Sequence, residues 1–477
     1  MIYALIIALV VVLVFWRTLK FGYCMDEWEV AKRNLREPKP KGAWDIFWKA
    51  FYGLHYLSPA LAHKITFTMH LINSLLVYYA FGADQISFFA ALLFVVHPAG
   101  CQGSIWLSGK YYSASTMILL LMYSFKWFVP LIYPLQFIFG GFNGILGPAV
   151  FLITPFWFWV FLIPPMLLIF KKRYMPAVNF KYSCAPTQTK KISPWRIMLY
   201  FKSLGYYTAL GLFPLRLGVY HEYLYTYGLS KKETDHWHRL DLYAIFGLLV
   251  FCLFAWCVIY SRTSPVTIGL FWYMAMISQW CNCPITMQQA IAERFIYLAL
   301  VGLMVAVVNA IYLIGNPVIQ SALLGAIFMG YLVRMLCQIG SYKNIYAQID
   351  YNILNFPRSH AVWTWKGSEE KNRGCPFTAL EAWFEGWKLR KTDFRLCNNI
   401  AVLLTDQCQF DQALDFLKIA SENIPPDQKE EGEAYIRNAM NRIAEMKRQI
   451  DLVQRKENRG EKTSKGGIIL PGGQING

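Results

Sequence analysis

The chain begins with the apolar run Ile2-Tyr-Ala-Leu-Ile-Ile-Ala-Leu-Val-Val-Val-Leu-Val-Phe-Trp16, and the loop after it contains Phe21-Gly-Tyr-Cys-Met-Asp26-Glu27-Trp28. The run predicts a helix in a bilayer, and its lack of a small-residue cleavage site indicates a retained anchor instead of a signal peptide. Carboxylates this close to a membrane face lose hydration, which is costly unless a partner or a chemical role offsets it. Asp26 and Glu27 are therefore candidates for chemistry at a bilayer surface, with an ordinary hydrated loop as the alternative.

The composition of the whole chain favours a membrane protein. Hydrophobic residues make up 56% of the 477 residues and charged residues only 16%, compared with about 25% charged residues in soluble domains. The net charge of +17 comes without a nucleic-acid-binding motif. Membrane lipids with anionic or phosphate-bearing headgroups are therefore the expected partners, and nucleic acid is not. The 11 Cys residues form no zinc spacing and no evident disulfide framework.

Apolar runs near the length of a bilayer core recur up to Gly340 and predict an all-α protein with about eleven transmembrane helices. The predicted spans are 2–17, 60–82, 85–98, 112–125, 127–140, 146–170, 197–217, 240–261, 266–281, 293–314 and 317–338. The segment 171–196 holds seven basic residues and no acid, which places it in the cytoplasm and the Asp26 loop outside. Eight basic residues in 17–58 oppose this orientation, although five acids accompany them. Merging the fourth and fifth spans would also reverse the orientation of the chain between them and the C-terminus.

The sequence after Ser341 becomes charged and helical and carries a repeat. The small residues Ala401, Ala413 and Ala420, followed by Pro425, fit a 34-residue helix-turn-helix repeat. The positions 34 residues before these three alanines are again small: Gly367, Ala379 and Gly386. The predicted domains are a membrane body at 1–340 with its first outer loop at 17–59, tetratricopeptide-like repeats at 341–455 and a flexible tail at 456–477. An unrelated helical bundle is the alternative for the repeats.

Further polar clusters lie at the predicted outer ends of the spans. His97, Gln102 and Lys110 offer an imidazole, an amide and a cation that suit a diphosphate or a sugar, with membrane-edge anchoring as the alternative. Glu293 and Arg294 precede a late span, where the Arg could hold a lipid-linked phosphate by two hydrogen bonds or form a structural ion pair with the Glu.

The loop after Pro214 carries Arg216 and His221, which suit a phosphate better than a metal. The neighbouring pair His221-Glu222 lacks the i, i+4 spacing of a zinc helix, so no metal site is predicted, and the need for a divalent metal stays open. His70 and Asn73 lie inside the second span, and we expect Asn73 to bridge helices.

Taken together, these elements resemble the tetratricopeptide-bearing transmembrane O-mannosyltransferases, within the GT-C class of polytopic glycosyltransferases. The elements are the acidic pair, His70-x-x-Asn73, His97-Pro98, Trp106-x-x-Gly109-Lys110, Glu293-Arg-Phe-Ile-Tyr297 and the 34-residue repeats. The resemblance implies a polyprenyl-phosphate sugar donor, an inverting transfer and a protein acceptor. It also implies Asp26 as the base or acceptor-binding carboxylate, and Arg294 with Lys110 as contacts of the donor phosphate. The sequence departs from the pattern at Gln102, where relatives often have Glu, at Lys110, where they often have Arg, and at the acidic pair, which is often Asp-Asp.

The function expected from the sequence is therefore transfer of a sugar from a polyprenyl-phosphate donor to a protein hydroxyl on the periplasmic or lumenal side of a bacterial inner membrane or an ER membrane. No cofactor beyond this lipid-linked donor is predicted, and the protein or peptide acceptor would bind the repeats. The alternative is a non-catalytic membrane scaffold that recruits partners through its repeats, which the departures at Gln102 and Lys110 keep open. A transporter ranks last because the spans carry few charges and no inverted repeat.

Overall fold

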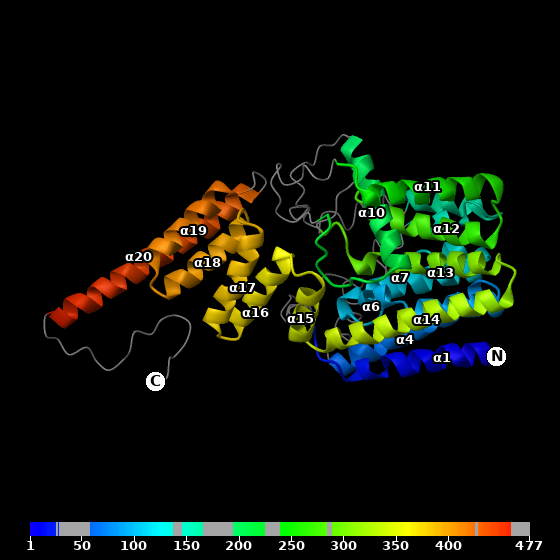
Figure 1. Cartoon of the computed structure of the whole chain (residues 1–477), viewed down its shortest axis with the longest axis horizontal. Helices are drawn as coiled ribbons and strands as arrows, with labels where there is room; N and C mark the ends of the chain where they lie inside the picture. Colours follow the sequence, from blue (N-terminus) through cyan, green and yellow to red (C-terminus); the bar gives the residue numbers. More distant parts are fainter. Residues whose placement is uncertain are drawn as a thin grey trace. The chain divides into compact units, whose positions relative to one another are not determined.

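The computed structural model describes residues 1–24, 27, 58–136, 146–165, 194–224, 239–283, 289–424 and 428–458. Every regular element in these ranges is a helix, so the predicted all-α class is confirmed for the described part of the chain. The described residues form two compact units, unit 1 up to Asn355 and unit 2 from Phe356 (Figure 1). The domain boundary predicted from the sequence lies earlier, between residues 340 and 341.

Unit 1 is a set of packed helices joined by short 3₁₀ turns. The α-helices are α1 (Ile2–Phe15), α4 (Pro59–Ala80), α5 (Gln85–Val96), α6 (Cys101–Ser104), α7 (Lys110–Ser124), α8 (Val129–Ile132), α10 (Pro194–Leu212), α11 (Leu242–Tyr260), α12 (Pro265–Ile277), α13 (Tyr297–Tyr312), α14 (Pro317–Ile339) and α15 (Ile345–Asn355). The 3₁₀ helices are η1 (Trp16–Lys20), η2 (Pro98–Gly100), η3 (Leu107–Gly109), η4 (Lys126–Phe128), η6 (Gly147–Phe151), η7 (Trp157–Leu162), η10 (Ser278–Trp280), η11 (Glu293–Phe295) and η12 (Gly340–Lys343). Helices α11, α12, α13 and α14 run side by side (Figure 1).

Three helical stretches of the described chain are long and apolar enough to cross a membrane: Ile2–Lys20, Leu242–Tyr260 and Pro317–Lys343. Two bent pairs raise this number to five if each pair is one span: Gln85–Val96 with Pro98–Ser104, bent by 64°, and Leu107–Ser124 with Lys126–Ile132, bent by 114°. Large apolar side chains such as Leu249 and Ile259 on α11 are exposed on these helices. Exposed apolar faces of this length are compatible with a lipid environment.

The other predicted spans differ from single long helices for local reasons. Pro98 and the residues after it break the third span at His97, because proline donates no backbone hydrogen bond. Described residues 146–165 form the short turns η6 and η7 instead of one helix. Helix α4 is long enough to span a membrane, but its polar residues, among them the buried His63, His70 and Asn73, lower its mean hydropathy below that of the three spans. Residues 137–140 and 166–170 of the predicted spans lie outside the described residues.

Glycines bring pairs of helices in unit 1 into backbone contact. A Cβ on Gly205 of α10 would overlap the carbonyl oxygen of Tyr243, and one on Gly247 of α11 would overlap that of Phe201. Gly302 of α13 makes the same kind of close approach to the α12 backbone. Small residues at such crossings are typical of helix packing in membranes.

The described residues of unit 2 form five successive helices: α16 (His360–Asn372), α17 (Pro376–Leu389), α18 (Phe394–Asp406), α19 (Phe410–Glu422) and α20 (Lys429–Asn458) (Figure 1). The small residues that the repeat predicts are buried where these helices meet. Ala379, Ala401, Ala413 and Ala420 are fully buried, and a Cβ on Gly367 would overlap the ring of Trp383. The small side chains therefore let these helices pack closely, while the repeat family stays a prediction. Pro425 lies outside the described residues.

Candidate functional site

Glu293 is the centre of a buried hydrogen-bond network in unit 1. Its side chain is fully buried and lies in η11, directly before α13. One carboxylate oxygen accepts a hydrogen bond from the backbone N–H of Gly218 and lies 3.5 Å from Nε2 of His221. The other oxygen accepts from Nε2 of Gln338 at 2.9 Å. These partners offset the cost of burying a carboxylate.

The network holds the segment 213–224, here called the post-α10 loop, through amide side chains. Gln102 donates from Nε2 to the carbonyl oxygen of Gly218 at 3.0 Å. Asn352 accepts from the backbone N–H of Val219 at 2.7 Å, and Gln289 donates to the carbonyl oxygen of the same residue. Because these amides come from α6, α15 and the segment before η11, the loop is fixed by parts of the chain that are distant in sequence.

Arg294 is held in one orientation beside this loop. Its backbone N–H donates to Oε1 of Gln102 at 3.2 Å, and its guanidinium donates to Oε1 of Gln289 at 2.8 Å. The guanidinium carbon lies 5.4 Å from the centre of the Trp106 ring and 4.9 Å from that of Phe295. A cation over two ring faces is attracted to both. The Arg294 side chain is only half-buried, so its guanidinium is both oriented and partly open to solvent or ligand.

Glu27 and Lys110 are two further buried charged residues of unit 1. Glu27 is fully buried and accepts hydrogen bonds from the backbone N–H groups of Cys24 and Leu107, each at 2.6 Å. Lys110 is the first residue of α7 and is fully buried, with Nζ 5.6 Å from the centre of the Tyr111 ring. Burial lowers the pKa of the Lys110 amine to about 7, and the nearby charge of Glu27 opposes this shift. Glu27 is thus bound to η3, which directly precedes α7, and is not a solvated loop acid.

The network around Glu293 and Arg294 and the surroundings of Glu27 belong to one continuous region. Leu107, which donates to Glu27, directly follows Trp106, whose ring lies against Arg294. The predicted residues brought together in this region are Glu27, Gln102, Lys110, His221, Glu293 and Arg294. Asp26 lies outside the described residues, but it directly precedes Glu27 in the sequence.

His97 and Arg216 make no hydrogen bond or ion pair with the other described residues of the predicted site. His97 donates from Nε2 to the carbonyl oxygen of Gly211 at 2.8 Å, and its ring packs against Tyr331 at 4.5 Å. His97 therefore holds the end of α10 and does not face Arg294. Arg216 is exposed on the post-α10 loop and makes no hydrogen bond or ion pair with the residues that the structure describes.

Asp241 fixes the far end of the post-α10 loop. It caps α11, lies 3.0 Å from Nζ of Lys202 and accepts a hydrogen bond from the hydroxyl of Tyr223 at 2.8 Å. Partial burial opposes ionisation, but hydrogen bonds from the N–H of Ala244 and from Lys202 and Tyr223 keep the pKa of Asp241 below its usual value. This carboxylate is therefore ionised at neutral pH and links α10, the loop and α11.

Several residues of the network carry no signal in the sequence. Gln289, Gln338 and Asn352 belong to no motif, and only the fold brings them to the post-α10 loop. Trp106 does belong to one of the motifs quoted above, but its contact with Arg294 was not foreseen. The predicted helix bridge is confirmed, because Asn73 of α4 donates to the carbonyl oxygen of Ser113 in α7 at 2.9 Å.

Neither a metal cluster nor a known relative adds to this picture. Within the described ranges, no group of three or more His, Cys, Asp and Glu side chains could hold a metal ion. The chain matches no protein-family model, and comparisons with curated proteins and with solved structures give no match. The function is therefore inferred from the site itself.

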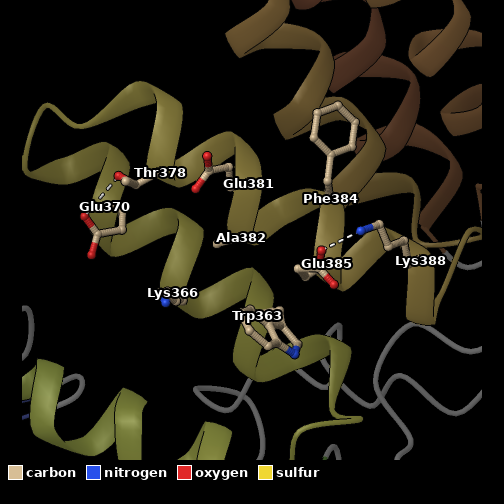
Figure 2. A pocket seen from close by; sticks show the side chains of 9 residues that line it. All are labelled: Trp363, Lys366, Glu370, Thr378, Glu381, Ala382, Phe384, Glu385 and Lys388. Atoms are coloured by element: carbon tan, nitrogen blue, oxygen red, sulfur yellow. Dashed lines mark hydrogen bonds and ion pairs between the residues drawn. The ribbon is translucent and has the colours of Figure 1, made fainter.

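Unit 2 contains a groove of about 640 Å³ between α16 and α17 (Figure 2). Its lining residues are Trp363, Lys366, Glu370, Thr378, Glu381, Ala382, Phe384, Glu385 and Lys388. Cavities of roughly 300–1,000 Å³ are typical of ligand sites. The groove is thus a second candidate binding site, built entirely from unit 2.

Proposed function

We propose that the chain is a polytopic membrane glycosyltransferase that moves a sugar from a polyprenyl-phosphate donor to a protein hydroxyl on the periplasmic or lumenal side. One observation carries the proposal: the half-buried guanidinium of Arg294 lies against the rings of Trp106 and Phe295, and Leu107, which directly follows Trp106, donates its N–H to the buried carboxylate of Glu27. An oriented cation in the same region as the residue that follows Asp26 is an arrangement suited to transfer from a phosphate ester to a hydroxyl.

The proposed reaction uses two kinds of group. Asp26 accepts the proton of the acceptor hydroxyl, and the oxygen bonds to the anomeric carbon of the sugar as the bond from that carbon to the phosphate oxygen breaks. Arg294 binds the departing polyprenyl phosphate by two hydrogen bonds, and Lys110 adds positive charge nearby. Because Gln289 and the rings of Trp106 and Phe295 already orient the guanidinium, little reorganisation accompanies the reaction.

A bilayer setting is part of the proposal. A lipid-linked donor enters from the membrane and a protein acceptor from water, so the reacting groups must lie where both can reach. The three long apolar helices and the exposed apolar face of α11 support a membrane location. The proposal keeps the eleven spans, the outer position of the Asp26 loop and the 34-residue repeats expected from the sequence.

The proposal is tested with the full chain reconstituted in liposomes, a panel of polyprenyl-phosphate hexoses and Ser- or Thr-containing peptides. Asp26→Asn should abolish transfer without loss of folding, and Arg294→Ala should slow it roughly a hundredfold, the usual cost of losing one preorganised charge-stabilising group. Asp350→Asn and Arg239→Lys, both on exposed residues outside the site, serve as controls. Full activity of Asp26→Asn would remove Asp26 from the mechanism.

A second function is favoured by the groove of unit 2. Such a groove suits a non-catalytic scaffold that recruits a protein through unit 2, with unit 1 as its membrane attachment. This alternative predicts that deletion of residues 341–477 abolishes function in cells, whereas Asp26→Ala and Arg294→Ala are both silent. The transferase predicts the opposite for the two point variants.

A further inference from the structure

We infer that the groove between α16 and α17 binds a short extended segment of a protein partner that carries Lys or Arg side chains. The inference rests on the recruiting role proposed for unit 2 and does not depend on sugar transfer in unit 1. It is drawn from the shape of the groove, from the distribution of charge along its walls and from the position of one tryptophan.

The floor of the groove is low because small residues lie where α16 and α17 cross. Ala382 is buried and contributes only a methyl group to the lining. Gly367 leaves room for the ring of Trp383, whose Nε1 donates to the carbonyl oxygen of Thr364 at 3.0 Å. The two helices therefore approach closely along their buried sides, and their longer side chains form the walls on the open side (Figure 2).

The length of the groove matches a few residues of extended chain. The lining residues of α17 run from Thr378 to Lys388, which is about 15 Å along a helix at 1.5 Å per residue. An extended chain covers about 15 Å in four to five residues. A segment of this length can lie along the groove and place alternate side chains against its two walls.

The walls carry more negative than positive charge. Three carboxylates line the groove, on Glu370, Glu381 and Glu385, with two ammonium groups, on Lys366 and Lys388. This excess of acid contrasts with the net charge of +17 for the whole chain. The groove is therefore a local site of attraction for cations on a basic protein.

Only part of this acidity is neutralised within unit 2. Glu385 is paired with Lys388, and Glu370 accepts a hydrogen bond from Thr378 (Figure 2). Glu370 also forms an ion pair with Arg373 at 3.8 Å. Glu381 is exposed and forms no ion pair with any residue in the described part of unit 2. Glu381 is thus available to pair with a cation of a bound segment.

Trp363 offers a second contact for a cation. Its Nε1 donates to the carbonyl oxygen of Pro357 at 2.9 Å, which fixes the ring at one end of the groove. Nζ of Lys366 already lies 5.5 Å from the ring centre, so the ring is placed where a cation can approach it. A Lys or Arg of the partner would replace Lys366 over the ring while a neighbouring basic side chain pairs with Glu381.

The test measures peptide binding to the full chain in nanodiscs by fluorescence anisotropy. The probes are two dye-labelled peptides of equal length, one with Arg and Lys at alternate positions and one with Glu there instead. The basic peptide should bind at least about tenfold more tightly than the acidic one, and its affinity should fall as salt rises. Glu370→Gln with Glu381→Gln should weaken its binding about three- to tenfold, in line with two part-exposed ion pairs. Glu430→Gln with Glu433→Gln, on exposed α20 residues, should have no effect.

The possible outcomes separate this inference from the recruiting role itself. Equal binding of the two peptides, preference for the acidic peptide, or no effect of the Glu370 and Glu381 changes would overturn the basic-segment inference while leaving recruitment by unit 2 intact. Binding of neither peptide would overturn both. Equal loss of binding in the α20 control would show that general surface charge, and not the groove, attracts the peptide.

Discussion

At the scale of single residues, Glu293 matters through the groups that it satisfies. Replacing it by Ala would leave the Gly218 N–H and the Gln338 amide buried without this acceptor. Each buried unsatisfied polar group costs about 1–3 kcal/mol. We therefore expect Glu293→Ala to destabilise unit 1 by about 3 kcal/mol, measured as a lower temperature of thermal unfolding in detergent. Asp350→Ala, on an exposed residue of α15, is the control and should leave this temperature unchanged.

Asp241 predicts a dependence of stability on pH. Its pKa is lower in the folded state, so its contribution is fully present above the unfolded pKa of about 4 and is lost as pH falls through the folded value. In Asp241→Asn this acid-dependent loss should disappear. Thermal unfolding followed from pH 6 down to pH 2 checks the effect. If the unfolding temperature of the variant depends on pH as that of the parent chain does, other carboxylates govern acid unfolding.

Residue types alone indicated part of this site. Glu293 and Arg294 stand out in the sequence because they precede a late apolar span, where an Arg can hold a lipid-linked phosphate or pair with the Glu. Their partners could not be predicted, because Gln289, Gln338 and Asn352 look like ordinary polar residues until the fold brings them to the post-α10 loop.

At the scale of helices, glycine sets how closely α10 and α11 pack. Gly247→Ala would put a methyl group into the carbonyl oxygen of Phe201, so the helices must separate. We expect a destabilisation of about 1–3 kcal/mol, typical of overpacking. Gly325→Ala on α14 is the matched control, because no atom lies within 4 Å of the new methyl group and alanine favours the helix. The temperature of thermal unfolding should therefore fall in Gly247→Ala and not in Gly325→Ala. Equal unfolding temperatures of the two variants would contradict the packing argument.

The predicted helices were most accurate where caps and apolar runs agree. Asp241, Ser264 and Asn316 each cap the N-terminus of a helix in unit 1, and each of these helices lies close to a predicted span. The prediction was weaker in the aromatic-rich region 112–165, where apolar composition alone suggested continuous spans. There the chain bends by 114° after α7 and forms short turns. Hydropathy does not encode where a helix breaks, so these breaks could not be predicted from apolar composition.

At the scale of the whole molecule, free cysteines provide a test of membrane topology. Cys252 and Cys337 are exposed on the apolar helices α11 and α14, whereas Cys375 and Cys408 are exposed in unit 2. In a bilayer, a charged maleimide should label the unit 2 thiols and leave the helix thiols unreacted, because a thiolate is too costly in hydrocarbon. The rate of labelling of each thiol is measured with single-cysteine variants in sealed vesicles of known orientation. Rapid labelling of Cys252 would contradict a lipid-facing α11.

The same labelling tests the predicted orientation. Positive-inside counting places the region after the last span outside, so Cys375 should react from the periplasmic or lumenal face. The predicted side of this region depends on the number of spans, and the described helices support between three and five by length and composition. Reaction of Cys375 only from the cytoplasmic face would reverse the proposed side of transfer.

The contacts of the post-α10 loop also determine the order in which the site can be completed during synthesis. The acceptor for the N–H of Gly218 is Glu293 and that for Val219 is Asn352, both made by the ribosome long after the loop itself. A nascent chain that ends before η11 therefore leaves both N–H groups without the acceptors of the finished protein. Assembly of the site is consequently a late event of biogenesis, and a chain released early should be recognised by quality control as unfinished.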